Sequence, residues 1–541
     1  MYRDAADGRL GGRLLVESLE AVGCQAAFGV PGIHALSLWD ALADSVVRYV
    51  GMRTELTAGF AADGYARAGG RPAAVVTTTG PGAIIGAAGL VEPRMSYVPV
   101  VNIATQVPRA LIGSGRGNIH ELAEQSEILS ALAKWHAVAR EVGELPELVR
   151  EAFRQSLTAP QGPVVLEVPC DLLTEQTAIP APAAVELDST SPAPTEAALA
   201  EAAALLAASE RPVVWAGGGV LRSGAAAAFT ALAERLDAPA VTTYMGKGAI
   251  PADHPLSAGS ACYEGAVMDL LRTADVVLAV GTELGEMATN QWTLTFEGRL
   301  IQVDVRSEHI GRSYPDALGV VGDAAAVLEG LASRVPTASR GGASRARAAH
   351  DRIAEGHAGQ GREAEFALLR SIREALPRGG IVAWDMTISG YIAAPFYPVY
   401  EPGTWLYPLG SGTLGYAWPA AIGAKVAQPH RDVLAVHGDG GVLYGLLELL
   451  TARQESIGAK LLIVDDEGYG ILRLIQEAAY GRTIGVDLHQ PDFPALVRSL
   501  GVPVHEAVPG HLDAPLRAAL AEAGPSVVHL PQQLVTPGRT P

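Results

Sequence analysis

Two short segments near the C-terminal end carry the residue types that bind a metal ion beside a phosphate. Residues 438–441 read Gly-Asp-Gly-Gly and follow the apolar run 433–436, while residues 465–469 read Asp-Asp-Glu-Gly-Tyr and follow the apolar run 461–464. Glycines let main-chain N–H groups approach a phosphate, and a helix that begins there adds its positive N-terminus. A carboxylate such as Asp439 fits this place when a hard cation lies between it and the phosphate oxygens.

The second segment supplies further oxygen ligands for such a cation. Asp466 stands 466 − 439 = 27 positions after Asp439, and the main-chain carbonyl of Gly468 can provide a third oxygen. A lone Gly-Asp-Gly is more often a turn or a cap, which stays the alternative for either segment by itself. The second segment, behind a second strand, favours a metal–phosphate site with Asp439, Asp466 and Gly468 as ligands.

A candidate acid lies far away in the N-terminal part of the chain. Glu55 follows Arg53-Thr54 and opens an alanine-rich stretch that continues through 61–66, which predicts a helix. A glutamate at this position can simply complement the helix dipole. The residues alone leave both roles open.

The elements that must position these residues alternate along the chain. Short apolar runs at 26–30, 73–79 and 164–168 are separated by helical stretches, which indicates a parallel, doubly wound sheet. Ligands bind such sheets at the carboxyl ends of the strands. Segments rich in Pro, Ala, Ser and Thr at 179–195, and a second one at 335–344, are predicted to be linkers. They separate three α/β domains, over residues 1–180, 195–335 and 363–541.

Composition narrows the class of protein. A length of 541 residues is enough for about three domains, and the net charge of −18 argues against a nucleic-acid partner, which requires a concentrated basic face. Cys24, Cys170 and Cys262 are far apart and fit neither a disulfide framework nor a zinc motif. The first residues show no signal-peptide pattern, and no uninterrupted apolar run reaches about 20 residues. We expect a soluble, cytoplasmic protein with no membrane partner.

Taken together, the motifs resemble those of the thiamine-diphosphate (ThDP) enzymes that include acetolactate synthase, benzoylformate decarboxylase, benzaldehyde lyase and related 2-oxoacid decarboxylases. The resemblance covers essentially the whole chain and follows the family order. The matching segments before the two metal segments are 29–32, 53–55, 61–67, 80–82, 253–255, 410–415 and 419–423.

The resemblance implies a domain assignment and an assembly. Residues 1–180 would bind the aminopyrimidine of ThDP, 195–335 would form a central Rossmann-like domain, and 363–541 would bind the diphosphate through Mg²⁺. Each active site would be shared between two subunits of a homo-oligomer, expected to be a tetramer. Glu55 of one subunit would then meet ThDP held by the C-terminal domain of another.

The resemblance also implies roles for single residues. Glu55 would hydrogen-bond N1′ of the aminopyrimidine and favour the imino tautomer, whose N4′ takes the proton from the thiazolium carbon; the resulting ylide attacks a 2-oxo group. Leu414 would prop the bend of the cofactor, and the Gly412 carbonyl would accept from the 4′-amino group. The other residues that fall at cofactor-binding positions are Pro31, Gly32, Gly80, Thr387, Gly410, Gly440, Gly441, Tyr469 and Ile471. Turn geometry and core packing are the alternative for these residues.

Two histidines are candidates for proton transfer to the substrate. His34 lies two positions after Gly-Val-Pro-Gly, near where benzaldehyde lyase-like enzymes carry an active-site histidine. His120 falls near a position that is often an active-site glutamine. A neutral imidazole shuttles protons near pH 7. A place at the surface or at the edge of a core is the alternative for each.

Two departures from the family pattern matter. The family usually has Asn where this chain has Asp466, which keeps an oxygen ligand but adds a charge beside the diphosphate; we expect metal binding to survive. The central domain lacks the Arg-Phe-Asp-Asp-Arg-like segment of flavin-binding acetolactate synthases. Residues 281–286, Gly-Thr-Glu-Leu-Gly-Glu, resemble instead non-flavin decarboxylases such as 5-guanidino-2-oxopentanoate decarboxylase. We therefore predict no FAD.

The sequence thus predicts a ThDP- and Mg²⁺-dependent lyase or transferase that decarboxylates a 2-oxo acid. Carboligation of the acetolactate synthase kind is the alternative within this class. A non-catalytic paralogue with a binding or regulatory role is the alternative from another class, and the presence of Glu55, Leu414 and Asp439 counts against it. A nicotinamide dehydrogenase does not fit, because 217–219 lacks the full dinucleotide fingerprint.

Overall fold

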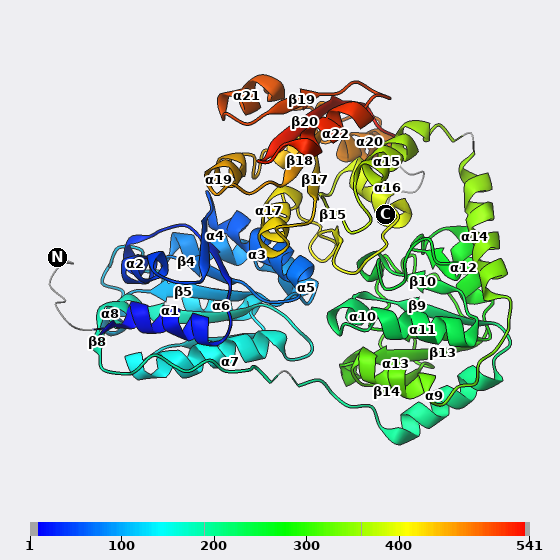
Figure 1. Cartoon of the computed structure of the whole chain (residues 1–541), viewed down its shortest axis with the longest axis horizontal. Coiled ribbons are helices and arrows are strands. Elements are labelled where there is room, and N and C mark those ends of the chain that lie inside the picture. Colours follow the sequence, from blue (N-terminus) through cyan, green and yellow to red (C-terminus); the bar gives the residue numbers. More distant parts are fainter. Residues whose placement is uncertain (1–8, 189, 359, 536–541) are drawn as a thin grey trace.

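Three parallel sheets organise the chain. The computed structural model describes residues 9–188, 190–358 and 360–535. Each sheet has six strands, and a two-stranded antiparallel pair joins β1 (Arg9–Leu10) to β8 (Gln176–Thr177). In Figure 1 the N-terminal domain runs from blue to cyan, the central domain is green, and the C-terminal domain runs from yellow to red. The predicted α/β fold with three parallel-sheet domains is confirmed.

The N-terminal sheet has the order β3-β2-β4-β5-β7-β6. Its strands are β2 (Ala26–Gly29), β3 (Arg48–Gly51), β4 (Ala74–Thr77), β5 (Val101–Gln106), β6 (Trp135–Val138) and β7 (Val164–Pro169). The helices of this domain are α1 (Gly11–Ala21), α2 (Leu36–Ala43), α3 (Glu55–Gly69), α4 (Pro81–Ala88), α5 (Val91–Met95), α6 (Gln125–Leu132), α7 (Leu145–Leu157) and α8 (Cys170–Thr174). Most of its strand residues are buried, as expected of a sheet covered on both faces.

The C-terminal sheet repeats that topology, with the order β16-β15-β17-β18-β20-β19. Its strands are β15 (Ile381–Trp384), β16 (Trp405–Leu406), β17 (Val433–Gly438), β18 (Lys460–Asp465), β19 (Val504–Glu506) and β20 (Ser526–Pro531). The helices are α15 (Glu363–Ala375), α16 (Ile388–Phe396), α17 (Ala417–Ala427), α18 (Asp439–Val442), α19 (Glu448–Gln454), α20 (Gly470–Tyr480), α21 (Phe493–Ser499) and α22 (Asp513–Ala521). In chain order both sheets read 2-1-3-4-6-5, so the N-terminal and C-terminal domains share one strand order.

The central sheet is wound differently, in the order β11-β10-β9-β12-β13-β14, the 3-2-1-4-5-6 order of a Rossmann fold. Its strands are β9 (Pro212–Ala216), β10 (Ala240–Thr242), β11 (Ser257–Gly259), β12 (Val276–Val280), β13 (Arg299–Asp304) and β14 (Leu318–Val321). The helices are α9 (Glu196–Ala208), α10 (Gly218–Arg222), α11 (Ala226–Leu236), α12 (Gly265–Arg272), α13 (Ala324–Ala332) and α14 (Gly342–His357).

The two predicted linkers differ in structure. The described part of 179–195 contains no helix or strand and crosses from the N-terminal to the central domain at the bottom of Figure 1. Only the first part of 335–344 is a loop, because helix α14 begins at Gly342. Alanines and arginines are good helix formers, so the basic cluster that follows the loop continues as helix. Its apolar side packs on the central domain through Ala346 and Ala349.

Helices α3 and α17 join the terminal domains, which share one buried core (Figure 1). Small residues bring the two backbones together. A Cβ added to Gly64 would fall 2.1 Å from the carbonyl oxygen of Ala420, and one added to Gly423 would fall 1.8 Å from that of Ala61. Glycine is therefore required at both positions. This contact fixes the orientation of α3, whose first residue is Glu55.

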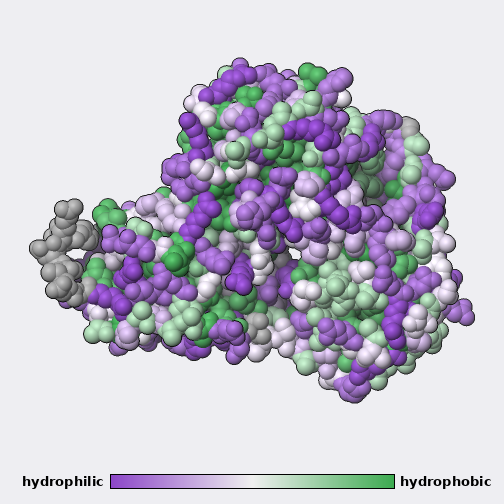
Figure 2. Space-filling view, in the orientation of Figure 1, coloured by the Kyte–Doolittle hydropathy of each residue, from purple (hydrophilic) through white to green (hydrophobic). Residues whose placement is uncertain are grey.

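The visible surface mixes hydrophilic and hydrophobic residues over all three domains (Figure 2). In the part of the chain that the structure describes, no helix combines the length and the apolar character needed to cross a membrane.

Candidate functional site

The predicted metal ligands lie just beyond the ends of two neighbouring strands. β17 and β18 pair in parallel, with Gly438 opposite Val464, so the residues that follow them meet at one edge of the sheet. Asp439 is fully buried, and the main-chain N–H of Asp466 points at its Oδ1, 3.5 Å away. The side chain of Gln490 donates to the other carboxylate oxygen of Asp439.

Burial disfavours the charge of both aspartates. Burial, followed by the charge of Asp439, raises the pKa of Asp466 to about 7, and burial also raises the pKa of Asp439. A divalent cation between them would offset this cost. Asp465 lies outside this pair, because its carboxylate contacts His529 at 2.9 Å. Of the tandem aspartates, only Asp466 faces the site.

A cation between Asp439 and Asp466 would take further oxygen ligands from the main chain. Within the described residues, no group of three or more His, Cys, Asp or Glu side chains is placed to hold a metal ion. Gly468 is suited to supply a carbonyl, since its φ of 146° is rare for other residues and an added Cβ would fall 2.2 Å from the carbonyl oxygen of Val486. Its role as a ligand remains a prediction.

A cavity of about 230 Å³ opens beside this pair. The predicted cofactor residues that line it are Thr387, Gly412, Leu414, Gly440, Gly441, Tyr469 and Ile471, together with Asp466 and Gly468. An added Cβ on Gly440 would fall 2.7 Å from the ring of Tyr469, and one on Gly441 would fall 2.4 Å from Oδ2 of Asp385. The glycines thus leave main chain, rather than side chain, on the cavity wall. This cradle fits a diphosphate held through a cation by Asp439 and Asp466.

Gly410 is not part of this lining. A Cβ on Gly410 would meet Oγ of Ser96 at 2.5 Å, so the residue faces the N-terminal domain instead. The loop that it opens still reaches the cavity two and four residues later, through Gly412 and Leu414.

Glu55 lies in the N-terminal domain at the first position of α3. Thr54 caps this helix, its Oγ1 accepting from the N–H of Thr57 at 3.2 Å. The carboxylate lies over α4, since a Cβ on Gly82 would fall 2.9 Å from its Oε1. The Thr54 cap fixes the start of the helix, and the absence of a side chain at Gly82 leaves space for the Glu55 carboxylate.

The two candidate histidines lie together. Their rings are 5.3 Å apart, edge to face, and neither buried Nδ1 has a hydrogen-bond partner among the described residues. Burial lowers the pKa of His34, and the neighbouring His120 lowers it further. His120 stands beside Gly80, where an added Cβ would fall 2.3 Å from its carbonyl oxygen. Gly32 lies at the same edge and packs against Thr78, where an added Cβ would fall 2.3 Å from the Thr78 Cβ.

Pro31 immediately precedes Gly32 at this edge, at the end of the connection that leaves β2. Gln125 supports the edge from inside the domain. It accepts from the Gly80 N–H at 2.7 Å and donates to Glu167 at 2.7 Å. This role could not be predicted from the sequence, because Gln125 belongs to no motif.

The single chain does not bring these two groups of residues together. Every residue that lines the 230 Å³ cavity comes from the C-terminal domain, whereas Glu55, His34 and His120 belong to the N-terminal domain. The structure therefore places the two groups of candidate residues in different domains, and the cavity is lined by only one of them.

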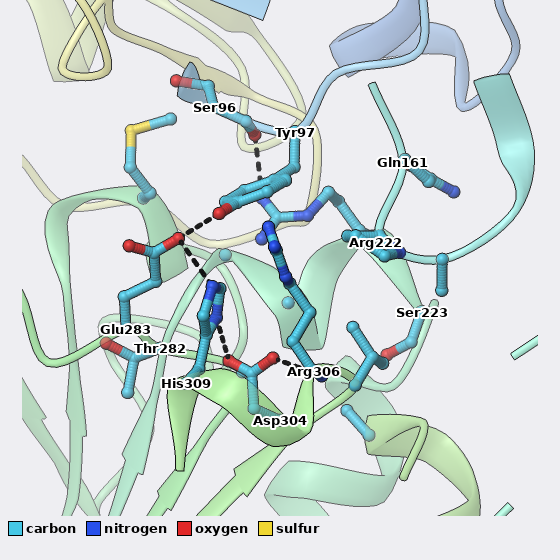
Figure 3. Close-up of a pocket in the computed structure, with 18 of the residues that line it drawn as sticks. Ser96, Tyr97, Gln161, Arg222, Ser223, Thr282, Glu283, Asp304, Arg306 and His309 are labelled. Carbon is cyan, nitrogen blue, oxygen red and sulfur yellow. Dashed lines mark hydrogen bonds and ion pairs between the residues drawn. The ribbon is translucent and has the colours of Figure 1, made fainter. Parts of the chain in front are cut away.

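A larger cavity, of about 670 Å³, lies between the N-terminal and central domains (Figure 3). Arg222 reaches across it to the carbonyl oxygen of Ser96 at 3.2 Å, and its guanidinium lies 5.4 Å from the ring centroid of Tyr97. Burial lowers the pKa of Arg222 to about 10. The Tyr97 hydroxyl donates to Glu283 on the opposite wall.

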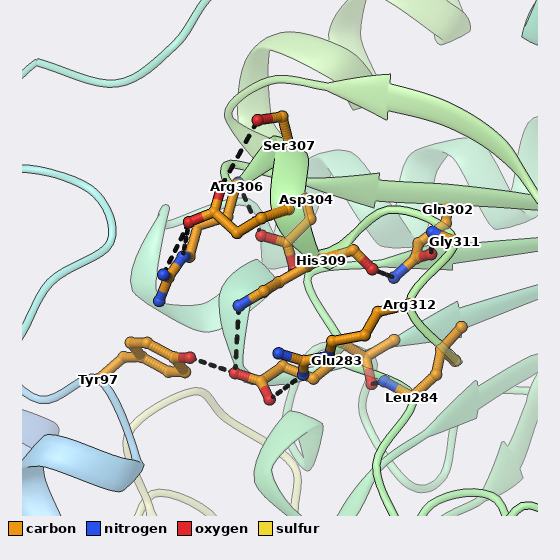
Figure 4. A network of polar contacts seen from close by, with 12 residues as sticks. Tyr97, Glu283, Leu284, Gln302, Asp304, Arg306, Ser307, His309, Gly311 and Arg312 are labelled. Atoms are coloured by element: carbon orange, nitrogen blue, oxygen red, sulfur yellow. Dashed lines mark hydrogen bonds and ion pairs between the residues drawn. The ribbon is translucent and has the colours of Figure 1, made fainter. Parts of the chain in front are cut away.

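Glu283 belongs to the segment 281–286 and is the centre of a polar network (Figure 4). It accepts from Arg312 at 2.9 Å and lies 3.9 Å from Nε2 of His309. The other ring nitrogen of His309 is 3.3 Å from Asp304. This network ties the N-terminal domain, through Tyr97, to the carboxyl ends of β12 and β13.

Comparison with known families identifies the chain. Residues 9–128, 199–331 and 385–530 match the family models described as thiamine pyrophosphate enzyme N-terminal TPP binding domain, central domain and C-terminal TPP binding domain. The chain belongs to the thiamine pyrophosphate (ThDP) enzyme family, as the motifs predicted.

Curated relatives match nearly end to end. The chain is 36% identical to a probable 2-ketoarginine decarboxylase of Pseudomonas aeruginosa, over 96% of this chain and 93% of the relative. It is 31% identical to a probable acetolactate synthase large subunit of Methanocaldococcus jannaschii, over 96% and 91%. It is 28% identical to the acetolactate synthase isozyme 1 large subunit of Escherichia coli, over 96% and 93%.

Proposed function

We propose that this ThDP enzyme decarboxylates a 2-oxo acid and requires Mg²⁺. The observation that carries the proposal is the buried pair of Asp439 and Asp466 beside a glycine-walled cavity. The relative that is 36% identical carries a decarboxylase name, which favours this reaction over carboligation. The relatives named acetolactate synthase support the second candidate, in which a second carbonyl compound captures the product of decarboxylation.

The residues of the C-terminal domain would bind and bend the cofactor. Asp439, Asp466 and the Gly468 carbonyl would hold Mg²⁺, and Gly440 and Tyr469 would border the diphosphate. ThDP, when bound, supplies an electron sink for the carbanion left by decarboxylation. Leu414 would support the bent conformation from beneath, which is an orientation effect.

The residues of the N-terminal domain would control proton transfer. Glu55 would hydrogen-bond the aminopyrimidine ring and set its tautomer. His34 and His120 have free ring nitrogens on one edge and would carry a proton to or from the substrate. The lowered pKa of His34 keeps this imidazole neutral at pH 7, so that it is able to accept a proton.

A complete site would require a second subunit, since the two groups of candidate residues lie in different domains and the cavity contains none of the N-terminal ones. Exposed apolar side chains border both. Ile33 and Ile119, exposed by 57% and 69%, flank the histidines, while Tyr444 and Leu447, exposed by 52% and 58%, follow the metal segment. Apolar residues this exposed are typical of a surface that is covered in an assembly. We propose a homo-oligomer, of which a tetramer is the expected form.

The experiment that tests this function is carbon dioxide release from a panel of 2-oxo acids, with product analysis, by protein reconstituted with ThDP and Mg²⁺. Release with a simple aldehyde product supports decarboxylation, and an acyloin or acetolactate product supports the second candidate. A protein that gains no thermal stability from ThDP and Mg²⁺ would be a non-catalytic paralogue. We also expect a colourless protein; a yellow one with bound flavin contradicts the prediction of no FAD. The three free cysteines accord with the proposed cytoplasmic location.

A further inference from the structure

The loop 410–416 of the C-terminal domain is held at its start by a carboxylate of the N-terminal domain. Glu92 is fully buried at the second position of α5. Its Oε2 accepts from the main-chain N–H and the hydroxyl of Ser411, at 2.7 and 2.8 Å. Its Oε1 accepts from the N–H of Gly410 at 3.3 Å, from Ser96 Oγ at 2.6 Å and from Arg67 Nη2 at 2.8 Å.

All five contacts to Glu92 are donors, so the site is built for a carboxylate with both oxygens accepting. A carboxamide of the same shape would set its NH₂ group against at least one fixed donor, because main-chain N–H groups and the Arg67 guanidinium cannot accept. Arg67 is the cation that compensates the buried charge, and it also contacts Asp63 at 2.6 Å. Asp63 in turn accepts from the Tyr416 hydroxyl at 2.5 Å.

A second carboxylate holds the other end of the loop. Asp385 is fully buried and accepts from the main-chain N–H groups of Gly415 and Tyr416, at 3.0 and 2.9 Å. His437 lies 3.0 Å from the same carboxylate. The loop between these two anchors carries Gly412 and Leu414, the residues that line the cofactor cavity.

The segment that carries Glu92 is itself tied to the central domain. Arg222 donates to the Ser96 carbonyl and Tyr97 donates to Glu283, as Figures 3 and 4 show. Three domains therefore converge on the start of the loop. Such an arrangement leaves the loop little freedom to move when the cofactor arrives.

We propose that Glu92 is a positioning residue for the cofactor. Its hydrogen bonds to Ser411 and Gly410 fix the position of the loop. The Gly412 carbonyl then meets the aminopyrimidine, and the Leu414 side chain meets the bend of ThDP. A loop that is ordered in advance costs less entropy on binding and holds reacting groups in register. Glu92 thus acts through the loop of its own chain, while Glu55 of the same domain serves the site of another subunit. This inference rests on the proposed binding of ThDP.

The test compares Glu92→Gln with the unaltered protein in two binding titrations, one with ThDP and Mg²⁺ and one with pyrophosphate and Mg²⁺. Pyrophosphate would occupy only the glycine cradle and the metal, and it lacks the aminopyrimidine that the Gly412 carbonyl and Leu414 would meet. We expect ThDP to bind about tenfold more weakly in Glu92→Gln, as loss of well-made hydrogen bonds to a charged group would cause. We expect the dissociation constant of pyrophosphate to be unchanged.

Two further variants keep the test decisive. Asp275→Asn alters a carboxylate of the central domain that likewise accepts from a serine hydroxyl and two main-chain N–H groups, and it should change neither titration. Ser411→Ala removes one contact to Glu92 and should weaken the binding of ThDP, but not of pyrophosphate, by a smaller factor than Glu92→Gln. This variant keeps the inference testable if Glu92→Gln does not fold. Equal weakening of ThDP and pyrophosphate, or of neither, in a variant that folds would overturn the inference. An unaltered protein that binds no ThDP would instead refute the proposed function.

Discussion

The main-chain N–H of Asp466 lies 3.5 Å from Oδ1 of Asp439, which places two acidic side chains at one edge of the C-terminal sheet. Burial and the charge of Asp439 raise the pKa of Asp466 to about 7, which means that the charged form of Asp466 is disfavoured here. A hard cation between the carboxylates would be coordinated by both and would offset their mutual repulsion. The departure from the family's asparagine therefore keeps a ligand oxygen but raises the charge of the site.

Asp466→Asn should retain ThDP and Mg²⁺ binding. The carboxamide oxygen replaces one ligand oxygen, and removal of the negative charge relieves the repulsion with Asp439. We expect activity within about threefold of the unaltered protein, and at least as much thermal stability without metal. Asp439→Asn is the comparison, because Asp439 is the fully buried member of the pair. Loss of cofactor binding in Asp466→Asn would show that the additional charge is required.

Glu55→Gln should lose turnover and keep the cofactor. The carboxamide preserves the shape of the side chain but cannot set the tautomer of the aminopyrimidine, so we expect kcat to fall about 10²–10⁴-fold. Glu196→Gln is a matched control, because Glu196 also opens a helix behind a threonine cap. If Glu55 only complements the helix dipole, both variants will lose a little stability and neither will lose activity.

Glu55→Gln and Asp439→Asn, each of which we expect to be inactive alone, should complement each other. In a mixed assembly of Glu55→Gln and Asp439→Asn chains, one of the two shared sites would combine an intact N-terminal half with an intact C-terminal half. Activity should reappear after subunit exchange and should follow the fraction of mixed dimers measured by native mass spectrometry. Mixtures that stay inactive although mixed dimers form would show that each site is built from a single chain.

His34→Ala and His120→Ala should each lower kcat/KM by about 10–10³-fold while ThDP binding is retained. The pKa of His34 is lowered below its ordinary value of 6.5, so the ring of the unaltered protein is mostly neutral at pH 6.5 and above. Activity that needs the neutral ring should therefore fall only at more acidic pH. The acidic limb of the pH profile should disappear or move in His34→Ala. An unchanged profile would assign the limb to another group.

Lys247 should make stability depend on pH. Burial lowers its pKa from 10.5 to about 7, and Nζ donates to Ser260 and to the Ala394 carbonyl at 2.8 and 2.9 Å. Between these pH values the unfolded chain binds a proton that the folded chain does not, so stability rises with pH, by at most about 1.4 kcal/mol per unit. Lys247→Met should lose this part of the slope of Tm between pH 7 and 9. An equal slope in both proteins would contradict the lowered pKa.

Local patterns were sufficient to predict most strands and the metal segments. The apolar runs predicted at 26–30, 73–79 and 164–168 coincide with β2, β4 and β7, because strands of a parallel sheet are buried on both faces and need continuous apolar residues. The linker at 335–344 was predicted too long at its C-terminal end. Gly342 already belongs to α14, where it packs against Asp237.

The sequence by itself determined the family, the cofactor class and the residues around Asp439 and Glu55, because these depend on short motifs whose chemistry is local. Tertiary structure alone decided that the 230 Å³ cavity is lined by the C-terminal domain and not by Glu55, and that only Asp466 of the tandem aspartates lines it. It also decided that Glu92 reaches a loop 318 positions away. Contacts between domains depend on how whole sheets pack, and a buried carboxylate with distant donors leaves no periodic or local trace in the sequence.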